Sequence, residues 1–232
     1  MILLFDSTFG INKSRFFSAF GSLFHLRGLK YKKHDDILID NFSHQVIIGT
    51  LLGDSRIERQ KISYNSRLCF EQGDVHKDYL FHLFDIFKPF TNLDTPSFRS
   101  RIHKVNGNIN NTFYFKTLSY PCFNFYHDLF YNNNIKIIPH NILDLLSPAS
   151  LAYWAMDDGS SSSSGFFLCT DSFSLDDVQL LIQVLNFKFR IDCNLNQKRI
   201  GQYRIYIKAN SMSHFKELVQ PYFHTSLLYK LS

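Results

Sequence analysis

The sequence repeats itself once, and this internal repeat restricts the possible folds more than any other feature. Each copy opens with a short apolar segment that carries an acid at its end, residues 46–54 in the first copy and 151–159 in the second. An extended segment with a Leu-Cys pair follows in both, at Leu68-Cys69 and at Leu168-Cys169. Similarity of this kind indicates one structural unit that is used twice.

The same order of elements is predicted in each copy. Residues 75–87 and 175–185 place apolar side chains three and four positions apart, which is typical of an amphipathic helix. The remaining elements are strands at 98–105, 110–118, 193–199 and 203–208 and closing helices at 123–130 and 215–219. We therefore predict an α+β protein with two pseudo-symmetric α-β-β-α-β-β-α halves and antiparallel sheets.

Local signals support several of these boundaries. Asn106-Gly107-Asn108 is a hairpin signal between two strands. Ser147 followed by Pro148 is typical of a helix start. Ser174 is a candidate N-cap, with Asp177 as its capping-box partner.

The repeat also divides the chain. Residues 1–40 show no clear amphipathic period and are predicted to be an N-terminal extension of uncertain order. The first half is expected at 41–140 and the second at 150–232, with a linker at 141–149. No stretch approaches the about 20 apolar residues needed to span a bilayer, and the start lacks the features of a secretory signal, so neither a targeting nor a transmembrane segment is expected.

Composition limits the classes of partner and site. The 25 Lys and Arg against 20 Asp and Glu give a net charge of +5, which suits a polyanionic partner. The four cysteines form no C-x-x-C pair, so no zinc site is expected and the thiols are expected to be reduced.

Two acids stand where helix stability alone would not place them. Asp54 and Asp158 end their predicted helices, where the negative end of the helix dipole disfavours a carboxylate. They lie 104 residues apart, a length that holds one complete unit of the repeat. The alternative is that both are turn residues without a chemical role.

On these two segments the chain resembles the LAGLIDADG homing endonucleases. Residues 47–55 and 151–159 align with the nine-residue motif, and the first copy keeps Gly49, Gly53 and the terminal Asp54. The resemblance covers residues 41–232 and is closest to the two-motif, monomeric, intron-encoded subgroup, which the segments around Lys136 and Lys230 also match.

The resemblance implies that the two motif helices pack against each other. Gly49 and Gly53 leave one helix face without side chains, so the backbones can approach closely. On the other helix Tyr153 faces the Gly49 position and Asp157 faces the Gly53 position, a departure from the ideal motif.

The resemblance also implies a site-specific endonuclease that makes a double-strand break in a long DNA target, an intron insertion site. The expected reaction is metal-dependent phosphodiester hydrolysis, in which a metal-activated water attacks the phosphate in line. Mg²⁺ is the expected cofactor, Mn²⁺ is expected to substitute, and Ca²⁺ is expected to bind without supporting cleavage. Because Mg²⁺ prefers hard oxygen ligands and keeps several waters, one carboxylate at each strand-cutting centre is sufficient.

Residue roles follow from the alignment with the motif. The implied catalytic residues are Asp54, Asp158, Lys136, Lys230 and Gln72. The implied metal ligands are Asp54, Asp158, Gly53 and Asp157, and the alignment favours Asp158 over its neighbour Asp157 as the residue that faces the metal. Alternatively, the two lysines are solvated surface residues and Gln72 is a polar strand end.

The strands carry the prediction of DNA binding. Polar and basic residues alternate with apolar ones along them, with almost no acid, so one face packs on helices and the other offers groups for bases and phosphates. The residues expected to bind DNA are Arg67, Arg99, Arg101, His103, Thr112, Tyr114, Lys116, Asn194, Lys198, Arg204, Tyr206 and Lys208.

Two other functions remain open at this point. A related RNA maturase, which assists splicing of its host group I intron, would keep the fold and would bind host-intron RNA. A non-catalytic DNA-binding protein would explain the basic strands but not the acids at both helix ends. A monomer that binds double-stranded DNA and no membrane is expected, and the Phe-, Asn-, Ile- and Lys-rich composition suggests an organelle, with the mitochondrion ahead of the chloroplast.

Overall fold

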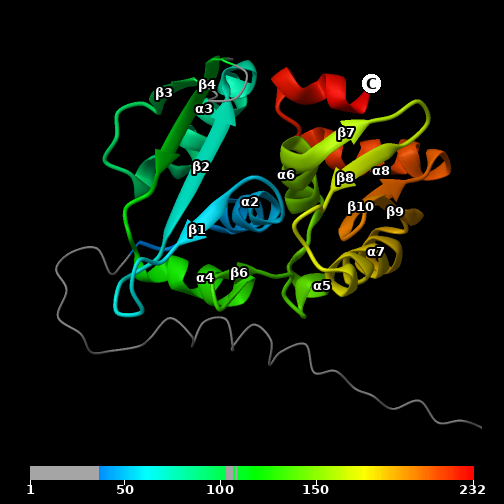
Figure 1. Ribbon diagram of the computed structural model, residues 1–232, viewed down its shortest axis with the longest axis horizontal. Helices are drawn as coiled ribbons and strands as arrows, with labels where there is room; N and C mark the ends of the chain where they lie inside the picture. The colour runs from blue at the N-terminus through cyan, green and yellow to red at the C-terminus, as the bar shows by residue number, and fades with distance from the viewer. Residues whose placement is uncertain (1–36, 103–106, 108) are drawn as a thin grey trace, which may run out of the picture. The chain divides into compact units, whose positions relative to one another are not determined.

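The computed structural model describes residues 37–102, 107 and 109–232 (Figure 1). The predicted extension therefore lies outside the described residues except for 37–40, and so does His103. Ile37 and Ile39 are partly buried against the hydrophobic core. No helix in the described part of the chain is long and apolar enough to cross a membrane.

Each half contains the seven elements that the repeat predicts. In the first half these are α2 (Asn41–Leu52), β1 (Arg56–Glu58), β2 (Arg67–Gly73), α3 (Lys77–Phe87), β3 (Ser97–Ile102), β4 (Ile109–Lys116) and α4 (Asn124–Phe130). In the second they are α6 (Pro148–Asp158), β7 (Gly159–Ser161), β8 (Phe166–Cys169), α7 (Leu175–Phe189), β9 (Cys193–Arg199), β10 (Gln202–Ile207) and α8 (Met212–Val219).

The shorter elements join these two series. They are η1 (Asp74–His76), η2 (Lys88–Phe90), η3 (Pro121–Phe123), β5 (Tyr131–Asn132), β6 (Ile135–Lys136), α5 (Ile142–Leu145), η4 (Ala209–Ser211), η5 (Gln220–Tyr222) and η6 (Thr225–Leu231). The predicted linker 141–149 contains α5 and the first residues of α6.

The two four-stranded sheets have the same topology. Their strand orders are β1-β2-β4-β3 and β7-β8-β10-β9, and every strand pair is antiparallel. The predicted α+β fold of two pseudo-symmetric halves is therefore confirmed.

Helix boundaries follow the capping residues. Helix α2 begins at Asn41, earlier than the predicted residue 46, because the Asp40 side chain caps it by accepting the Ser43 N–H. Helices α6 and α7 begin where predicted, since Ser147 and Ser174 each form a capping box.

For one residue of the first amphipathic helix, the prediction of a place in the core is wrong. Val75 was expected on its apolar face, but it lies in η1 and is 87% exposed. The short η1 turn precedes α3, so the helical period that buries Tyr79, Leu80 and Leu83 starts only at Lys77.

Helices α2 and α6 pack together at the centre of the described unit (Figure 1). Every residue of α2 from Val46 to Leu52 is buried, because α2 is covered on several sides. A Cβ at Gly49 would overlap the Ser150 carbonyl and would lie 2.7 Å from Tyr153 Cβ, so the two backbones are in close contact there. Behind the first sheet, Phe70 stacks between Phe87 and Phe115 and fixes α3 to the sheet.

Candidate active site

The two motif acids lie at the ends of the packed helices. Asp54 follows the C-cap of α2 and is exposed, whereas Asp158 is the last residue of α6 and is partly buried. Burial and, after it, the negative charge of Asp54 raise the pKa of Asp158, so the two carboxylates are close enough to interact. The structure therefore brings together the two acids that the sequence separates by 104 residues.

Lys136 reaches the end of α2 from a tight hairpin. Strands β5 and β6 pair antiparallel through Asn133 and Asn134, whose φ angles of 49° and 63° are typical of a type I′ turn. From β6 the Lys136 Nζ donates hydrogen bonds to the carbonyl oxygens of Gly53 (3.0 Å) and Ser55 (3.1 Å). The ammonium group thus bonds to the residues on both sides of Asp54.

Lys230 holds the corresponding place in the second half. It lies in η6, and its Nζ donates to the carbonyl oxygens of Met156 and Asp157, the latter at 3.2 Å. Both lysines therefore bind backbone carbonyls at the C-terminal end of a motif helix, where a cation is favoured by the helix dipole.

Burial and charge shift the pKa values of this cluster. Burial lowers the pKa of Lys136 to about 8, although Asp158, Asp157 and Asp54 oppose this. Burial also lowers the pKa of Lys230. The pKa of Asp158 rises to about 7 because of burial and of the Asp54 charge, and the two lysines compensate only in part. The acids thus carry negative charge that the protein does not fully neutralise.

Gln72 lies at the first acid, as predicted. Its Nε2 donates a hydrogen bond of 2.9 Å to Asp54 Oδ2. By the strand registers, in which Ser161 pairs with Phe166 as Ile57 pairs with Leu68, the equivalent position in the second half is Thr170. Its hydroxyl donates to the Tyr203 carbonyl oxygen at 2.7 Å.

Asp157 makes contacts that the motif alignment does not predict. Its Oδ1 accepts from Tyr79 Oη at 2.8 Å, and its Oδ2 accepts from the backbone N–H of Asp54 at 3.2 Å. Gly53 is adjacent to it, since a Cβ there would lie 2.6 Å from Asp157 Oδ2.

The predicted DNA-binding residues of the first half share one face of its sheet. The registers place Arg99 opposite Thr112 and Glu71 opposite Tyr114, so these side chains point to the same side. The Arg99 guanidinium lies over the Tyr114 ring, 4.7 Å from its centroid. Arg101 is exposed on the same face.

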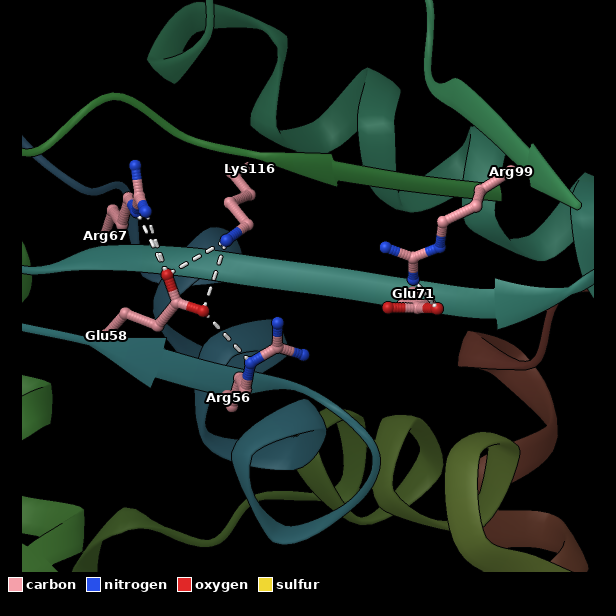
Figure 2. A network of polar contacts seen from close by, with 6 residues as sticks. All are labelled: Arg56, Glu58, Arg67, Glu71, Arg99 and Lys116. Atoms are coloured by element: carbon pink, nitrogen blue, oxygen red, sulfur yellow. Dashed lines mark hydrogen bonds and ion pairs between the residues drawn. The ribbon is translucent and has the colours of Figure 1, made fainter. Parts of the chain in front are cut away.

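Acids also lie on this face, contrary to the expectation of almost none. Glu58 of β1 accepts from Arg56 at 3.2 Å and from Arg67 and Lys116 at 3.0 Å each (Figure 2). Burial alone would raise the pKa of Glu58, but the hydrogen bonds from Lys116 and Arg67 lower it to about 2. Arg99 pairs with Glu71 in the same way (Figure 2). The two acids lie in β1 and β2, whereas the prediction of a face with almost no acid was based mainly on the strands in which polar and apolar residues alternate.

The second sheet repeats this arrangement. Arg204 makes two hydrogen bonds of 2.9 Å to Asp171, and Lys198 Nζ lies 3.7 Å from the same carboxylate. Lys208 pairs with Asp192 at 2.9 Å, while Tyr206 contacts Ser164 and Asn194 is exposed.

Comparison with known families identifies the chain. The family model described as the LAGLIDADG DNA endonuclease family matches residues 44–215, which include both motif helices and both sheets. The chain belongs to this family. The predicted resemblance to LAGLIDADG homing endonucleases is thereby confirmed.

Individual LAGLIDADG proteins agree with this assignment. The cytochrome b mRNA maturase bI2 of Debaryomyces hansenii is 33% identical over 196 residues, 83% of this chain and 74% of that protein. The DNA endonuclease I-ChuI of Chlamydomonas applanata is 30% identical over 204 residues, 81% of this chain and 93% of that protein. The structure of the homing endonuclease I-WcaI bound to its DNA recognition sequence matches with a TM-score of 0.80 and 27% identity, and covers 90% of this chain and 97% of that chain.

The donor set of this LAGLIDADG site fits a hard divalent cation. Asp54, Asp158 and the Gly53 carbonyl offer oxygen ligands, and burial, followed by the charge of Asp54, raises the pKa of Asp158. Within residues 37–102, 107 and 109–232 no group of three or more His, Cys, Asp or Glu side chains could hold a metal ion. A divalent cation that keeps several waters needs few protein ligands, so these donors are sufficient for one.

Sequence reasoning missed two residues beside the LAGLIDADG acids. Tyr79 is fully buried and reaches Asp157 from α3. The pKa of His76, in η1, is lowered by burial and by the charge of Lys230, and the charge of Asp54 opposes this shift. His76 therefore lies near both Lys230 and Asp54. Both belong to the segment just before and within α3, whose apolar period was interpreted as packing only.

Proposed function

We propose that the protein is a site-specific DNA endonuclease that cuts both strands of a long duplex target with a divalent cation, Mg²⁺ in the first place. The observation that carries this proposal is the pairing of Asp54 and Asp158 at the ends of two packed helices, each with a lysine on the neighbouring carbonyls, half-buried at Lys136 and buried at Lys230. A purely structural protein gains no stability from two acids at that position.

Each acid has a defined task in this proposal. Asp54 with the Gly53 carbonyl would hold a cation at one cutting centre, and Asp158 would hold one at the other. Each cation, when bound, supplies an activated water and neutralises charge on the leaving oxygen. The water oxygen bonds to phosphorus as the bond to the 3′ oxygen breaks, which leaves a 5′ phosphate and a 3′ hydroxyl. Lys136 and Lys230 hold the carbonyl groups next to the acids in place, and their charge favours the phosphate.

The two sheets supply the DNA interface in this proposal. Their polar faces carry the arginines and lysines that contact phosphates and base edges. The arrangement as two pseudo-symmetric halves within one chain supports action as a monomer, one half for each side of the target.

The experiment that tests the proposal is cleavage of a duplex that spans the uninterrupted insertion site of the protein's own gene, with and without Mg²⁺. Asp54→Asn and Asp158→Asn are run beside the wild type, with the exposed Asp144→Asn as the matched control. We expect metal-dependent double-strand cutting that each motif variant loses by at least about 100-fold, or about 2.7 kcal/mol, while the control cuts normally. Binding of this duplex without cutting would contradict the endonuclease.

An RNA role is the second candidate. It is favoured by one observation, the 33% identity to a protein named as a cytochrome b mRNA maturase. That name and the composition also support a mitochondrial gene. Splicing of the host intron in vitro, with the Asp54→Asn and Asp158→Asn proteins, separates the two activities, because an RNA role does not need both acids.

A further inference from the structure

Asp157 differs from Asp158 in what its carboxylate binds. The side chain of Asp157 points from α6 into the end of α2, where its Oδ2 accepts the backbone N–H of Asp54 at 3.2 Å. Its Oδ1 accepts the Tyr79 hydroxyl at 2.8 Å. Both oxygens therefore have protein donors, and these come from the first half of the chain although Asp157 belongs to the second.

The end of α2 leaves space for the Asp157 side chain. A Cβ on Gly53 would overlap Asp157 Cβ and lie 2.6 Å from its Oδ2, so only a glycine leaves room for the carboxylate. Tyr79, 1% exposed, holds the other oxygen from α3. The carboxylate is thus enclosed by α2 and α3 and reaches the backbone of the first motif acid.

We propose that Asp157 is a positioning residue that fixes the backbone of Asp54 across the helix interface, and that it supports cutting at the Asp54 centre only. The proposal rests on the endonuclease function given above. The motif alignment implied that Asp157 is a metal ligand, and the proposal gives it a positioning role instead. The second centre has no counterpart of this contact, because the residue of α2 equivalent to Asp157 is Gly53.

A second contact at the same interface provides a matched control. Four residues earlier on α6, the Tyr153 hydroxyl hydrogen-bonds to His82 Nε2 at 2.7 Å. This pair also joins α6 to α3, with Tyr153 buried and His82 half-buried, but it does not touch Asp54. Tyr153→Phe therefore removes a comparable contact between the halves and leaves the support of Asp54 intact.

The test follows each strand separately, with a duplex labelled at one 5′ end at a time. The strand that Asp54→Asn no longer cuts identifies the Asp54 centre. We expect Asp157→Ala to slow that strand by about 10- to 100-fold and to leave the other strand within about twofold. Asp157→Asn is expected to cut nearly normally, because an amide oxygen still accepts the Asp54 N–H and its amide group can donate to Tyr79.

Several results would overturn the proposal. An Asp157→Asn protein as slow as Asp157→Ala would show that the negative charge is needed, as for a metal ligand. Equal slowing of both strands, or no slowing by Asp157→Ala, would also contradict it. If Asp157→Ala does not fold, Tyr79→Phe replaces it and is expected to slow the same strand to a smaller extent.

A readout without metal or DNA separates this proposal from the endonuclease itself. The Asp54 amide proton is expected to exchange with solvent about tenfold faster in Asp157→Ala than in the wild type, and at the wild-type rate in Tyr153→Phe. Unchanged exchange in Asp157→Ala would overturn the positioning role even if the wild type cuts DNA. Faster exchange in a wild type that cuts no duplex would instead leave the contact established and the proposed function wrong.

Discussion

Gln72 donates a hydrogen bond of 2.9 Å from its Nε2 to Oδ2 of Asp54. Asp54 follows a helix and Gln72 lies in a strand of the sheet proposed to bind DNA, so this bond joins the acid to that sheet. Because Gln72 alternates with Glu71, it reaches Asp54 from the face opposite the arginines. In the second half Thr170 lies at the equivalent place, and its hydroxyl donates to the Tyr203 carbonyl oxygen. The two proposed cutting centres therefore differ in their polar surroundings.

Gln72→Ala is expected to slow cutting of the strand assigned to Asp54 by about 10-fold or more, because groups that orient a metal-binding carboxylate contribute this much to activity. Binding of the target duplex should change little. The measurement is strand-resolved cleavage under single-turnover conditions. Thr170→Val, which removes the hydroxyl at the equivalent place of the second half, is the matched control. Slowing by it as strong as by Gln72→Ala would contradict the asymmetry.

Much of the helix interface follows from the sequence. The 3.6-residue period decides which residues of each motif share a face, so Tyr153 opposite Gly49 and Asp157 opposite Gly53 were predictable, and the distances confirm both. The pairs of consecutive strands, such as β1–β2 and β3–β4, follow from the order of elements, because hairpin-connected strands pair antiparallel, whereas the β2–β4 and β8–β10 pairs do not.

Other contacts depend on long-range packing that no local pattern encodes. Asp157 bonds to Tyr79, which is 78 residues away on another helix, and its partner depends on how α3 packs against α6. Glu58 meets Lys116 only because β2 lies between their strands in the sheet. The alternation of polar residues predicted a polar face, but not that acids on neighbouring strands would pair with its cations.

The raised pKa of Asp158 makes stability depend on pH. Its folded-state pKa of about 7 lies above the ordinary value of 3.8, so the folded state binds the proton more tightly and the free energy of unfolding falls as pH rises from about 4 to about 7. Asp158→Asn removes this contribution. We expect the variant to be more stable than the wild type at pH 8 by about 1–3 kcal/mol, and the difference to vanish near pH 4.

Urea unfolding in EDTA at several pH values measures this difference. EDTA is needed because a bound divalent cation would neutralise the Asp158 carboxylate and hide its destabilising effect on the folded protein. A variant that is no more stable than the wild type at pH 8 would contradict the argument. Asp144→Asn, at an exposed acid of α5, provides the control for the loss of one charge.

Glu58 is expected to govern how strongly the first sheet binds unrelated DNA. It holds Arg56, Arg67 and Lys116, and its carboxylate repels phosphates (Figure 2). Glu58→Gln frees the three cations and removes the repulsion, so affinity for a random duplex should rise and become more salt-dependent. The ratio of target to random affinity, measured by fluorescence anisotropy between 50 and 200 mM salt, a range chosen around physiological ionic strength of about 150 mM, is expected to fall by about 10-fold.

The control for Glu58 is an acid away from the sheet face. Asp128 also pairs with an arginine, Arg59, at 3.0 Å, but it is exposed on α4. Asp128→Asn changes the net charge by the same amount. If both variants raised random binding equally, net charge alone would explain the effect and the role of Glu58 would be wrong.

Gly49 sets the distance between the two motif helices, so it is expected to tolerate no side chain. A Cβ there would overlap the Ser150 carbonyl and lie 2.7 Å from Tyr153 Cβ, and neither neighbour is the flexible end of a side chain. We expect Gly49→Ala to lower the free energy of unfolding by about 1–3 kcal/mol, despite the higher helix propensity of alanine. Gly73→Ala is the matched control, since its Cβ would meet only Val75 Cγ2, at 4.0 Å. Equal stability of Gly49→Ala and the wild type in urea unfolding would show that the helices can separate to admit a methyl group, and that close backbone contact does not hold the two halves together.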